Sequence, residues 1–449
     1  VDEDPQKFLG SLVTFSGKSD EIYEFIKSKI RCKLENIEKT LIRPEYKLKI
    51  YTMYMLPSIR FILTVHDLKK YHLDKLDSMC EPYLKSWLHI PKHGANTAFI
   101  HDKHGLNIST ITDLYMECHT LAHSRTREIG DPVVNHALDS KLTRESQWTR
   151  QLSTTSVCEE RYKKAVAEKP QMSSWKSTKT AVKKVFADEK ASHWKAVIEP
   201  LIFQGDYLKL LQEENQDITW KSIIYDMPAN VLRFAVNASI NCLPTNDNLS
   251  RWGKKTSAKC KLCANTATLH HVLNNCCNML DRYAWRHNNI LYHLVKTLKS
   301  QAFTMYSDLE NNGVAGGTVP PDVIPTELKP DIVITWKDIK RVSIIELTVP
   351  FECNIDHAHK RKSEKYCCLV EDIRSAGYTV DFWTLEIGSR GYISKNNMLN
   401  LKNITKLLKC EQSASKLSVS LSKLAILGSY SVYNSRNEPT WNVNNYLKV

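Results

Sequence analysis

The spacing of hydrophobic residues predicts that most of the chain before residue 300 is helical. Apolar side chains recur there every three or four residues, which is the period of an amphipathic helix. The stretch KFLGSLVTF near the start instead predicts a short strand broken at Gly10, and residues 126–228 predict a charged helical linker without a compact core. The predicted helices cover residues 21–65, with interruptions at Pro44 and Pro57, then 68–90, 110–125, 229–242 and 281–299.

A second pattern begins after residue 330. Two runs rich in Ile, Val and Thr, 331–336 and 342–349, flank the turn KDIK and predict a β-hairpin. A helix over 356–376 and a strand over 379–387 follow, so this part has the order α–β–β–α–β. The chain is therefore predicted to be a multidomain α+β protein with an α/β domain at its end.

Each strand of the predicted hairpin carries one acidic residue among apolar neighbours. Asp331 opens the first strand and Glu346 interrupts the second. Buried carboxylates need partners, because an unpaired charge away from water is costly. Pairing of the strands through their turn brings the two acids to the same end of the hairpin, where a Mg²⁺ ion between them would relieve their repulsion. Glu352 is a weaker candidate ligand.

The spacing of these acids resembles the PD-(D/E)xK pattern of metal-dependent nucleases of the restriction-endonuclease type. That pattern has a lysine two residues after the second acid, where this chain has Thr348. The helix that follows offers a substitute, because Lys362 falls on its apolar stripe and Lys365 borders the same face. The alternative is that HKRKSEK is only the polar start of a helix. The stripe consists of Ala358, Lys362, Tyr366, Leu369 and Ile373.

A cluster of cysteine and histidine residues has the spacing of a zinc site, C-x2-C-x7-H-x4-C. Two thiolates from a tight turn, with an imidazole and a thiolate from one face of a following helix, suit tetrahedral zinc. His270 and Cys277 adjoin two of the ligands and are alternatives, but Leu269, Val272 and Leu273 form the apolar side of the helix if His271 and Cys276 bind. With four protein ligands the zinc is structural rather than catalytic. The predicted ligands are Cys260, Cys263, His271 and Cys276.

The net charge of +13 favours a polyanionic partner. Between Arg161 and Lys195 there are ten basic and three acidic residues, an excess of seven, so more than half of the net charge lies in this segment. Trp175 and Trp194 lie among these lysines. They favour nucleic-acid binding through base stacking, against the alternative of a solvated helical face.

The remaining features of the composition concern the cell compartment. No apolar run approaches the ~18 residues that a membrane span needs, so we expect no membrane-spanning helix. Thirteen cysteines without an export signal favour a reducing compartment, with the cysteines free or metal-bound. The first residues, VDEDPQKFLG, include neither an initiator Met nor a signal peptide, and they suggest a chain that begins partway through a longer protein.

Together these features resemble the C-terminal half of a non-LTR retrotransposon polyprotein, of the class that carries a restriction-like endonuclease. The knuckle CKLC…TLHHVLNNC is followed by DRYAWRHNNIL and then by KPD…E…K..KY, in the family's order. KFLGS, KSWLHIPKHG…HGLNI and LPTNDNLSRWG resemble segments upstream of the knuckle, and EIGSRGY and LGSYSVYNSRN resemble the end of the nuclease. The resemblance implies the end of a reverse transcriptase palm at 1–20, a thumb at 21–125, a basic helical linker at 126–228, a zinc knuckle with its approach helix at 229–280, and a nuclease at 281–449.

The resemblance also implies an activity. Asp331 and Glu346 would bind Mg²⁺, and Lys362 or Lys365 would polarise the attacking water or the phosphate, so that the enzyme nicks target double-stranded DNA by hydrolysis. The freed 3′-OH would prime reverse transcription of the element's RNA in the nucleus, after synthesis of the protein in the cytoplasm with that RNA. The thumb, linker and knuckle would bind RNA and DNA, and neither a small-molecule substrate nor a membrane is expected.

One part of the family's machinery is expected to lie outside this chain. The paired aspartates of the polymerase belong before KFLGS, so this chain alone is not expected to polymerise. The competing hypothesis is a decayed or domesticated fragment that binds nucleic acid without cutting it. An intact set of Asp331, Glu346 and a lysine favours the enzyme, and the late start of the chain favours decay.

Overall fold

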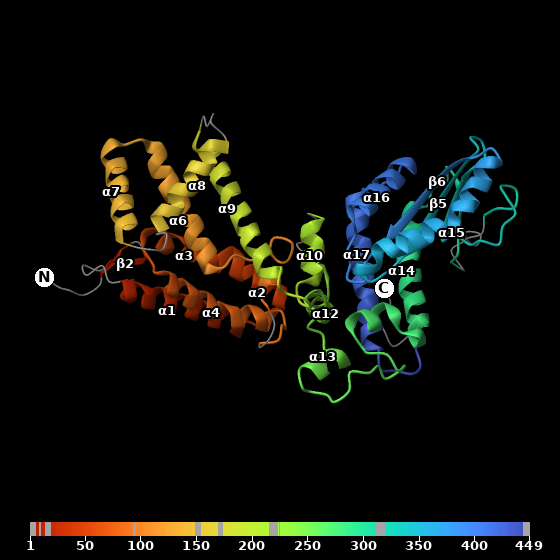
Figure 1. Ribbon diagram of the computed structural model, residues 1–449, viewed down its shortest axis with the longest axis horizontal. Helices are drawn as coiled ribbons and strands as arrows, with labels where there is room; N and C mark the ends of the chain where they lie inside the picture. The colour runs from red at the N-terminus through yellow and green to blue at the C-terminus, as the bar shows by residue number, and fades with distance from the viewer. Residues whose placement is uncertain are drawn as a thin grey trace. The chain divides into compact units, whose positions relative to one another are not determined.

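The structure is a computed structural model of the 449-residue chain, and it describes residues 6–8, 10–13, 19–92, 96–148, 154–168, 174–214, 223, 225–309 and 319–442 (Figure 1). The chain divides into two compact units, Val1–Lys209 and Leu210–Val449. The described residues are mostly helical, with a two-stranded hairpin and a four-stranded sheet, so the fold is mixed α+β as predicted. Within these ranges no helix is both long and apolar enough to traverse a bilayer.

The first unit begins with a hairpin rather than a single strand. Strands β1 (Gln6–Phe8) and β2 (Ser11–Val13) pair antiparallel, and Gly10 lies between them with a φ of 78°. A positive φ is costly for residues with a Cβ, and glycine adopts it freely, so Gly10 reverses the chain where the sequence predicted only a break. Of the predicted palm segment 1–20, the structure describes only residues 6–8, 10–13, 19 and 20.

Helices make up the rest of this unit, largely where the sequence predicts them. The predicted interruption at Pro44 is real, because Pro44 begins a new helix at a position where its missing N–H is not needed. At Pro57 the helix continues, since a π-helical turn at Tyr51–Met55 precedes the proline. The helices are α1 (Ser19–Lys39), α2 (Pro44–Ile50), α3 (Leu56–Val65), α4 (Lys70–Trp87), α5 (Ala98–His101), α6 (Ile111–Ile129), α7 (Pro132–Trp148), α8 (Thr154–Glu168) and α9 (Trp175–Ile198); α10 (Asp206–Glu213) spans the division between the units.

Helices α8 and α9 pack against α6, so the region predicted to lack a compact core has a small one. It is formed by Ala165, Ala181, Val182 and Val185, with Leu121 of α6 packed against them. Alanine and valine let the helix backbones approach closely, which a pattern of charged residues does not reveal.

The basic run of α8 and α9 is largely paired with acids of the same unit. Of the nine basic residues of this run that the structure describes, six form ion pairs: Arg161, Lys163, Lys164, Lys183, Lys184 and Lys190. The two tryptophans have partners as well, because Trp194 stacks on His101 and the Arg125 guanidinium lies over the ring of Trp175. Nucleic-acid binding by this run stays a prediction.

The second unit is built around a sheet of order β3-β4-β5-β6, in which only β5 and β6 are parallel. The predicted hairpin is β4 and β5, and β6 follows the predicted helix, α15. Strand β3 has four residues, too few for the alternation of apolar and polar residues to predict it. The elements are α12 (Ala229–Ser239), α13 (Asn246–Arg251), α14 (Leu280–Leu298), β3 (Thr304–Ser307), β4 (Ile332–Trp336), β5 (Arg341–Thr348), α15 (Ile355–Ser375), β6 (Thr379–Glu386), α16 (Lys395–Leu407) and α17 (Ala414–Asn434).

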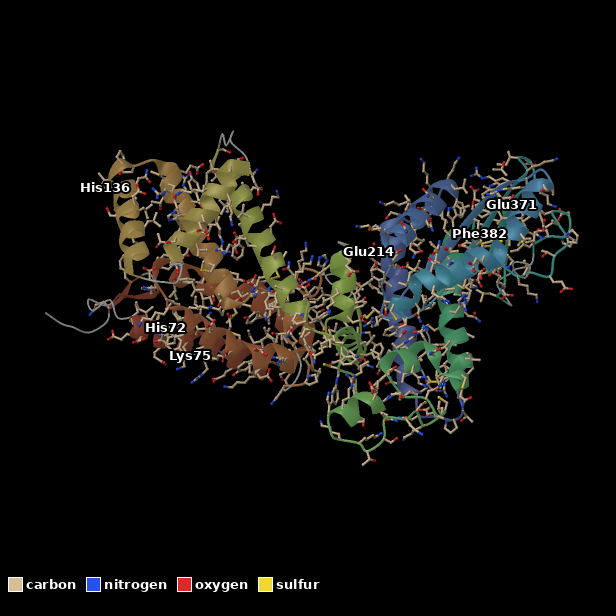
Figure 2. The ribbon with its side chains drawn as sticks, viewed as in Figure 1. His72, Lys75, His136, Glu214, Glu371 and Phe382 are labelled. Carbon is tan, nitrogen blue, oxygen red and sulfur yellow. The ribbon has the colours of Figure 1, made fainter. Side chains whose placement is uncertain are left out.

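Helices cover both faces of this sheet. Helix α15 packs on one face, against Val333, Val342 and Ile344, while α14, α16 and α17 pack on the other (Figure 1). Burial of both faces explains why β4 and β5 are almost continuously apolar. Figure 2 shows Phe382 on β6 beside α15 and Glu371 on the outer side of that helix. An acid on β5 that faces α15 is therefore enclosed between sheet and helix.

A buried ion pair fastens the chain after β5 to the chain after β6. The Arg390 Nε donates to Glu352 Oε2 (2.7 Å), and the Arg390 main-chain N donates to Oε1 (2.6 Å). Gly388 permits this contact, because a Cβ there would lie 2.6 Å from the Glu352 carboxylate. Both side chains are almost fully buried, so each charge depends on the other for compensation.

Replacement of Arg390 by alanine is expected to destabilise the C-terminal unit by about 3–5 kcal/mol, because the Glu352 carboxylate then stays buried without its cation. Urea denaturation followed by tryptophan fluorescence measures the change. Arg374→Ala is the control, since Arg374 pairs with Glu371 on the exposed side of α15 and its loss should cost less than about 1 kcal/mol. Equal losses for the two variants would contradict this account of the pair.

Candidate metal centre and carboxylate cleft

The four predicted zinc ligands converge on one point. Cys260 and Cys263 lie on a tight turn, and His271 opens the π-helical turn His271–Asn275. Cys276 follows that turn in an extended conformation, so the expectation that one helix carries both His271 and Cys276 is wrong by one residue. The wider π turn nevertheless brings residue i+5 above residue i. The ligand atoms of all four residues lie within 4.8 Å of one another.

The distances and protonation states fit zinc. The Cys276 Sγ lies 3.9 Å from the Sγ atoms of both Cys260 and Cys263, and Zn–S bonds of about 2.3 Å at tetrahedral angles place sulfurs about 3.8 Å apart. The His271 Nε2 lies 3.3 Å from the Cys263 Sγ, and burial followed by the nearby His270 lowers the pKa of His271, which favours the neutral imidazole that binds metals. Burial and the neighbouring thiols raise the pKa of Cys276 to about 12, so a cation is needed to hold these sulfurs as thiolates.

The two alternative ligands have other surroundings. His270 lies outside the cluster, with its Nε2 3.1 Å from the Asn354 Nδ2 and its ring against Phe351. Cys277 is exposed, and its Sγ faces the side chain of Asn278. The structure therefore places His271 and Cys276, and not their neighbours, in the metal centre.

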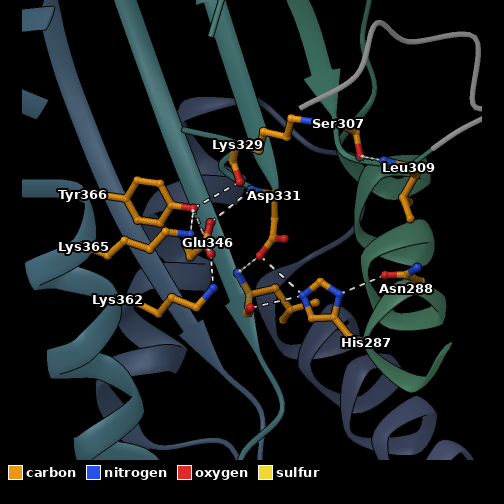
Figure 3. A network of polar contacts seen from close by, with 11 residues as sticks. His287, Asn288, Ser307, Leu309, Lys329, Asp331, Glu346, Lys362, Lys365 and Tyr366 are labelled. Carbon is orange, nitrogen blue, oxygen red and sulfur yellow. Dashed lines mark hydrogen bonds and ion pairs between the residues drawn. The ribbon is translucent and has the colours of Figure 1, made fainter. Parts of the chain in front are cut away.

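The two acids of the hairpin lie side by side. Residues Ile332 and Ile345 are paired in the sheet, which brings Asp331 and Glu346 to the same end of the hairpin, as predicted. The Asp331 main-chain N donates to Glu346 Oε2 (3.0 Å) (Figure 3). Both side chains are buried, and burial together with the negative charge of Asp331 raises the pKa of Glu346, although Lys362 opposes the shift. A positive charge beside the two acids therefore relieves their repulsion.

The structure distinguishes the two candidate lysines. The Lys362 Nζ donates directly to Glu346 Oε1, from the apolar stripe of α15 as predicted. The Lys365 Nζ lies 3.0 Å from the Tyr366 hydroxyl instead, and that hydroxyl lies 3.4 Å from Glu346 Oε1 (Figure 3). Lys365 thus reaches the acid only through a phenol. Thr348, at the usual lysine position, makes no such contact, and its buried Oγ1 has no hydrogen-bond partner among the described residues.

His287 is a further member of the site, which the sequence analysis does not identify. Its Nε2 lies 3.4 Å from Asp331 Oδ2 and 3.2 Å from the Leu347 carbonyl, and its Nδ1 faces Asn288 Oδ1. Burial lowers the pKa of His287, but the Asp331 carboxylate outweighs this effect and the pKa is raised. Lys362 was identified because it is a polar residue on an apolar helical stripe. His287 has the same position on its own helix, so the same pattern could have identified it. On α14 that stripe includes Ile290, Leu291 and Leu294.

A cleft of about 560 Å³ opens beside the acids. Arg286, Arg361 and Lys362 supply positive charge, and Asp331 is the one acidic residue in the part of the lining that the structure describes. Burial lowers the pKa of Arg286 to about 10, which leaves it charged at neutral pH. The cleft therefore suits an anionic ligand. The polar lining comes from the knuckle, α14, the end of the hairpin and α15, and includes His270, Asn274, Asn275, Arg286, His287, Asp331, Thr348, His357, Arg361 and Lys362.

Glu352 does not belong to this site. Both of its carboxylate oxygens accept hydrogen bonds from Arg390, and it is absent from the lining of the cleft. Its prediction as a further metal ligand is wrong, because residues after the strand leave the sheet and no longer follow its alternation of faces.

The ligand set and its fold define a small zinc-binding domain. Residues 205–283, which contain all four ligands, match a family of domains described as zinc-binding in reverse transcriptase. This match supports a protein related to the reverse transcriptases of retrotransposons, and it agrees with a Zn²⁺ ion held by three cysteines and one histidine. No curated protein matches the chain.

Cys260→Ser is expected to release about one zinc ion per chain, because a tetrahedral structural site depends on all four ligands. Elemental analysis of the purified protein measures the content. Cys277→Ser is the matched control, since it alters a cysteine next to a ligand but outside the cluster, and it should keep its zinc. Retention of zinc by the first variant, or its loss from the second, would show the ligand assignment to be wrong.

Proposed function

We propose that the C-terminal unit is a Mg²⁺-dependent endonuclease of the PD-(D/E)xK type. It nicks target double-stranded DNA and leaves a 3′-OH from which the element's RNA is reverse transcribed. The observation that carries the proposal is the convergence of Asp331, Glu346 and Lys362 beside a cationic cleft. The order α14–β3–β4–β5–α15–β6 and the similarity to a zinc-binding domain of reverse transcriptases also support it.

The acid pair has the composition of a magnesium site. Mg²⁺ in proteins is commonly held by one or two carboxylates and several waters. Asp331 Oδ2 accepts from the Leu347 main-chain N (2.7 Å), while Oδ1 has no hydrogen bond to any residue that the structure describes. Among the described residues, Glu346 Oε2 accepts only from the Asp331 main chain, so each acid has an oxygen suited to a cation. A bound Mg²⁺ would supply a water of lowered pKa and stabilise negative charge on the leaving oxygen.

The other residues of the cleft have roles that follow from their charges. Lys362 borders both Glu346 and the cleft, so its ammonium group can offset the negative charge that develops on a phosphate there. Arg361 is exposed on the lining and can contact a neighbouring phosphate, which positions the strand without reading its sequence, while the buried Arg286 adds positive charge behind the lining. This division of roles predicts that the rate of nicking depends more on Lys362 than on Lys365.

The same proposal gives the first unit and the knuckle a role in binding nucleic acid. The first unit contributes the thumb and basic linker, and with the knuckle it binds element RNA and DNA in the nucleus. The net charge of +13 supports this assignment.

A second candidate is a domesticated fragment that binds nucleic acid without cutting it. The ion pair of Lys362 with Glu346 favours it, because this acid already has a cationic partner without a metal.

Asp331→Ala is expected to reduce nicking of supercoiled plasmid in Mg²⁺ by more than about 100-fold, because a first ligand should matter at least as much as the residues that orient it. The relaxed-circle product is quantified on agarose gels, and circular dichroism verifies the fold. Asp338→Ala, in the exposed turn of the same hairpin, is the control. Equal cutting by wild type and Asp331→Ala would refute the active site, and absence of cutting by a folded wild type would favour the binding fragment.

Lys362→Ala is expected to lower the nicking rate about 10²–10³-fold, as for removal of one group that stabilises transition-state charge. Lys365→Ala is the matched control on the same helix. Its nicking rate should fall much less, because the Lys365 ammonium group contacts Tyr366 and not the acid. Adding Thr348→Lys to Lys362→Ala should restore part of the rate, since it returns a lysine to the strand. Equal losses for the two single variants would contradict the choice of Lys362.

A further inference from the structure

Helix α14 connects the zinc knuckle to the acid pair. In its first turn, the Tyr283 hydroxyl accepts a hydrogen bond from the main-chain N of Cys276 (3.1 Å), and its proton faces the carbonyls of Val272 (3.0 Å) and His271 (3.2 Å). One phenol therefore holds the main chain at both ends of the turn that joins His271 to Cys276. One turn later on the same helix, His287 reaches Asp331. Residues four apart on a helix share a face, so the two contacts are fixed relative to one another.

His287 constrains one oxygen of Asp331. Oδ2 lies 3.4 Å from the His287 Nε2 on one side and accepts from the Leu347 main-chain N on the other (Figure 3). With Oδ2 held, rotation of the carboxylate is restricted and Oδ1 is kept in a defined place. Outer contacts of this kind commonly set how well a carboxylate binds a metal.

A second connection runs from the knuckle to the end of β5. The Asn274 Nδ2 donates to the Val349 carbonyl (2.6 Å), and the Arg286 Nη2 donates to the same oxygen (3.2 Å). Val349 lies three residues after Glu346. Helix α14 thus contacts Asp331, and α14 and the knuckle together hold the chain three residues after Glu346.

We propose that His287 is a positioning residue for Asp331, and that the knuckle sets the place of His287 through Tyr283. The zinc centre then does more than fold its own loop, because it becomes part of the scaffold that orients the nuclease's first acid. This inference rests on the proposed function, in that Asp331 is taken as a Mg²⁺ ligand, but the second of its tests does not depend on turnover.

The first test compares His287→Leu with His287→Gln. The leucine variant removes the donor and is expected to raise the Mg²⁺ concentration for half-maximal nicking about 10-fold or more, with a smaller change in rate at saturating Mg²⁺. The glutamine variant keeps an N–H donor and should recover most of the affinity. His293→Gln, on the same helix without a contact to the acids in the described residues, is the control. An unchanged Mg²⁺ midpoint for His287→Leu would overturn the proposal.

Calorimetric titration with Mg²⁺ gives a second readout that needs no cleavage. If wild type binds Mg²⁺ and His287→Leu binds it about 10-fold more weakly, the positioning role stands even where no nicking is seen, and only the proposed nuclease function fails. Equal Mg²⁺ affinities for the two proteins would overturn the positioning role while leaving the nuclease possible. A wild type that neither binds Mg²⁺ nor nicks would overturn both.

Tyr283→Phe tests the link to the knuckle. Loss of the hydroxyl should leave about one zinc ion per chain, since no ligand is altered, and should raise the Mg²⁺ midpoint in the same direction as His287→Leu. Tyr292→Phe, an exposed tyrosine on the same helix, is the matched control. Full zinc content together with an unchanged Mg²⁺ midpoint in Tyr283→Phe would overturn the connection between knuckle and acid.

Discussion

Burial of the Glu346 carboxylate between sheet and helix is the constraint on which the C-terminal unit depends. A buried charge must be compensated, and here the Lys362 ammonium and the Asp331 main-chain N supply partners for its two oxygens. Asp331 is held in the same way by Leu347 and His287. Two helices on opposite faces of the sheet thus each contribute a nitrogen partner to one end of the hairpin, Lys362 from α15 and His287 from α14. Displacement of either helix would leave an acid with its main-chain partner alone.

This constraint explains why the zinc centre and the sheet belong to one compact unit. Helix α14 begins near the metal ligands and contacts Asp331 one turn later, so its N-terminal half is held by both sites. Asn274 adds a direct hydrogen bond from the knuckle to the chain after β5. A zinc site with four protein ligands supplies rigidity rather than chemistry. Its rigidity is transmitted through short contacts to the place where we propose that chemistry occurs.

The first unit shows how a charge pattern can be read in two ways. The basic run of α8 and α9 predicts a polyanionic partner, yet six of its nine described basic residues pair with acids within the unit. Sequence reasoning counts charges along the chain, and it does not count acids brought close by folding. The same limit hid the small core beneath these helices, because its alanines and valines lie too sparsely among charged residues to form an apolar stripe.

What the sequence by itself determined is local. The C-x2-C-x7-H-x4-C spacing identified the zinc ligands, two runs rich in Ile, Val and Thr around a turn identified β4 and β5 with their acids, and the period of α15 placed Lys362 on its inner face. Each of these features spans a short segment of the chain, so its geometry follows from the local backbone conformation. Only the tertiary structure decided between Lys362 and Lys365, removed Glu352 from the site and added His287. Those outcomes depend on distances between side chains up to about 44 positions apart in the chain, which no single period encodes.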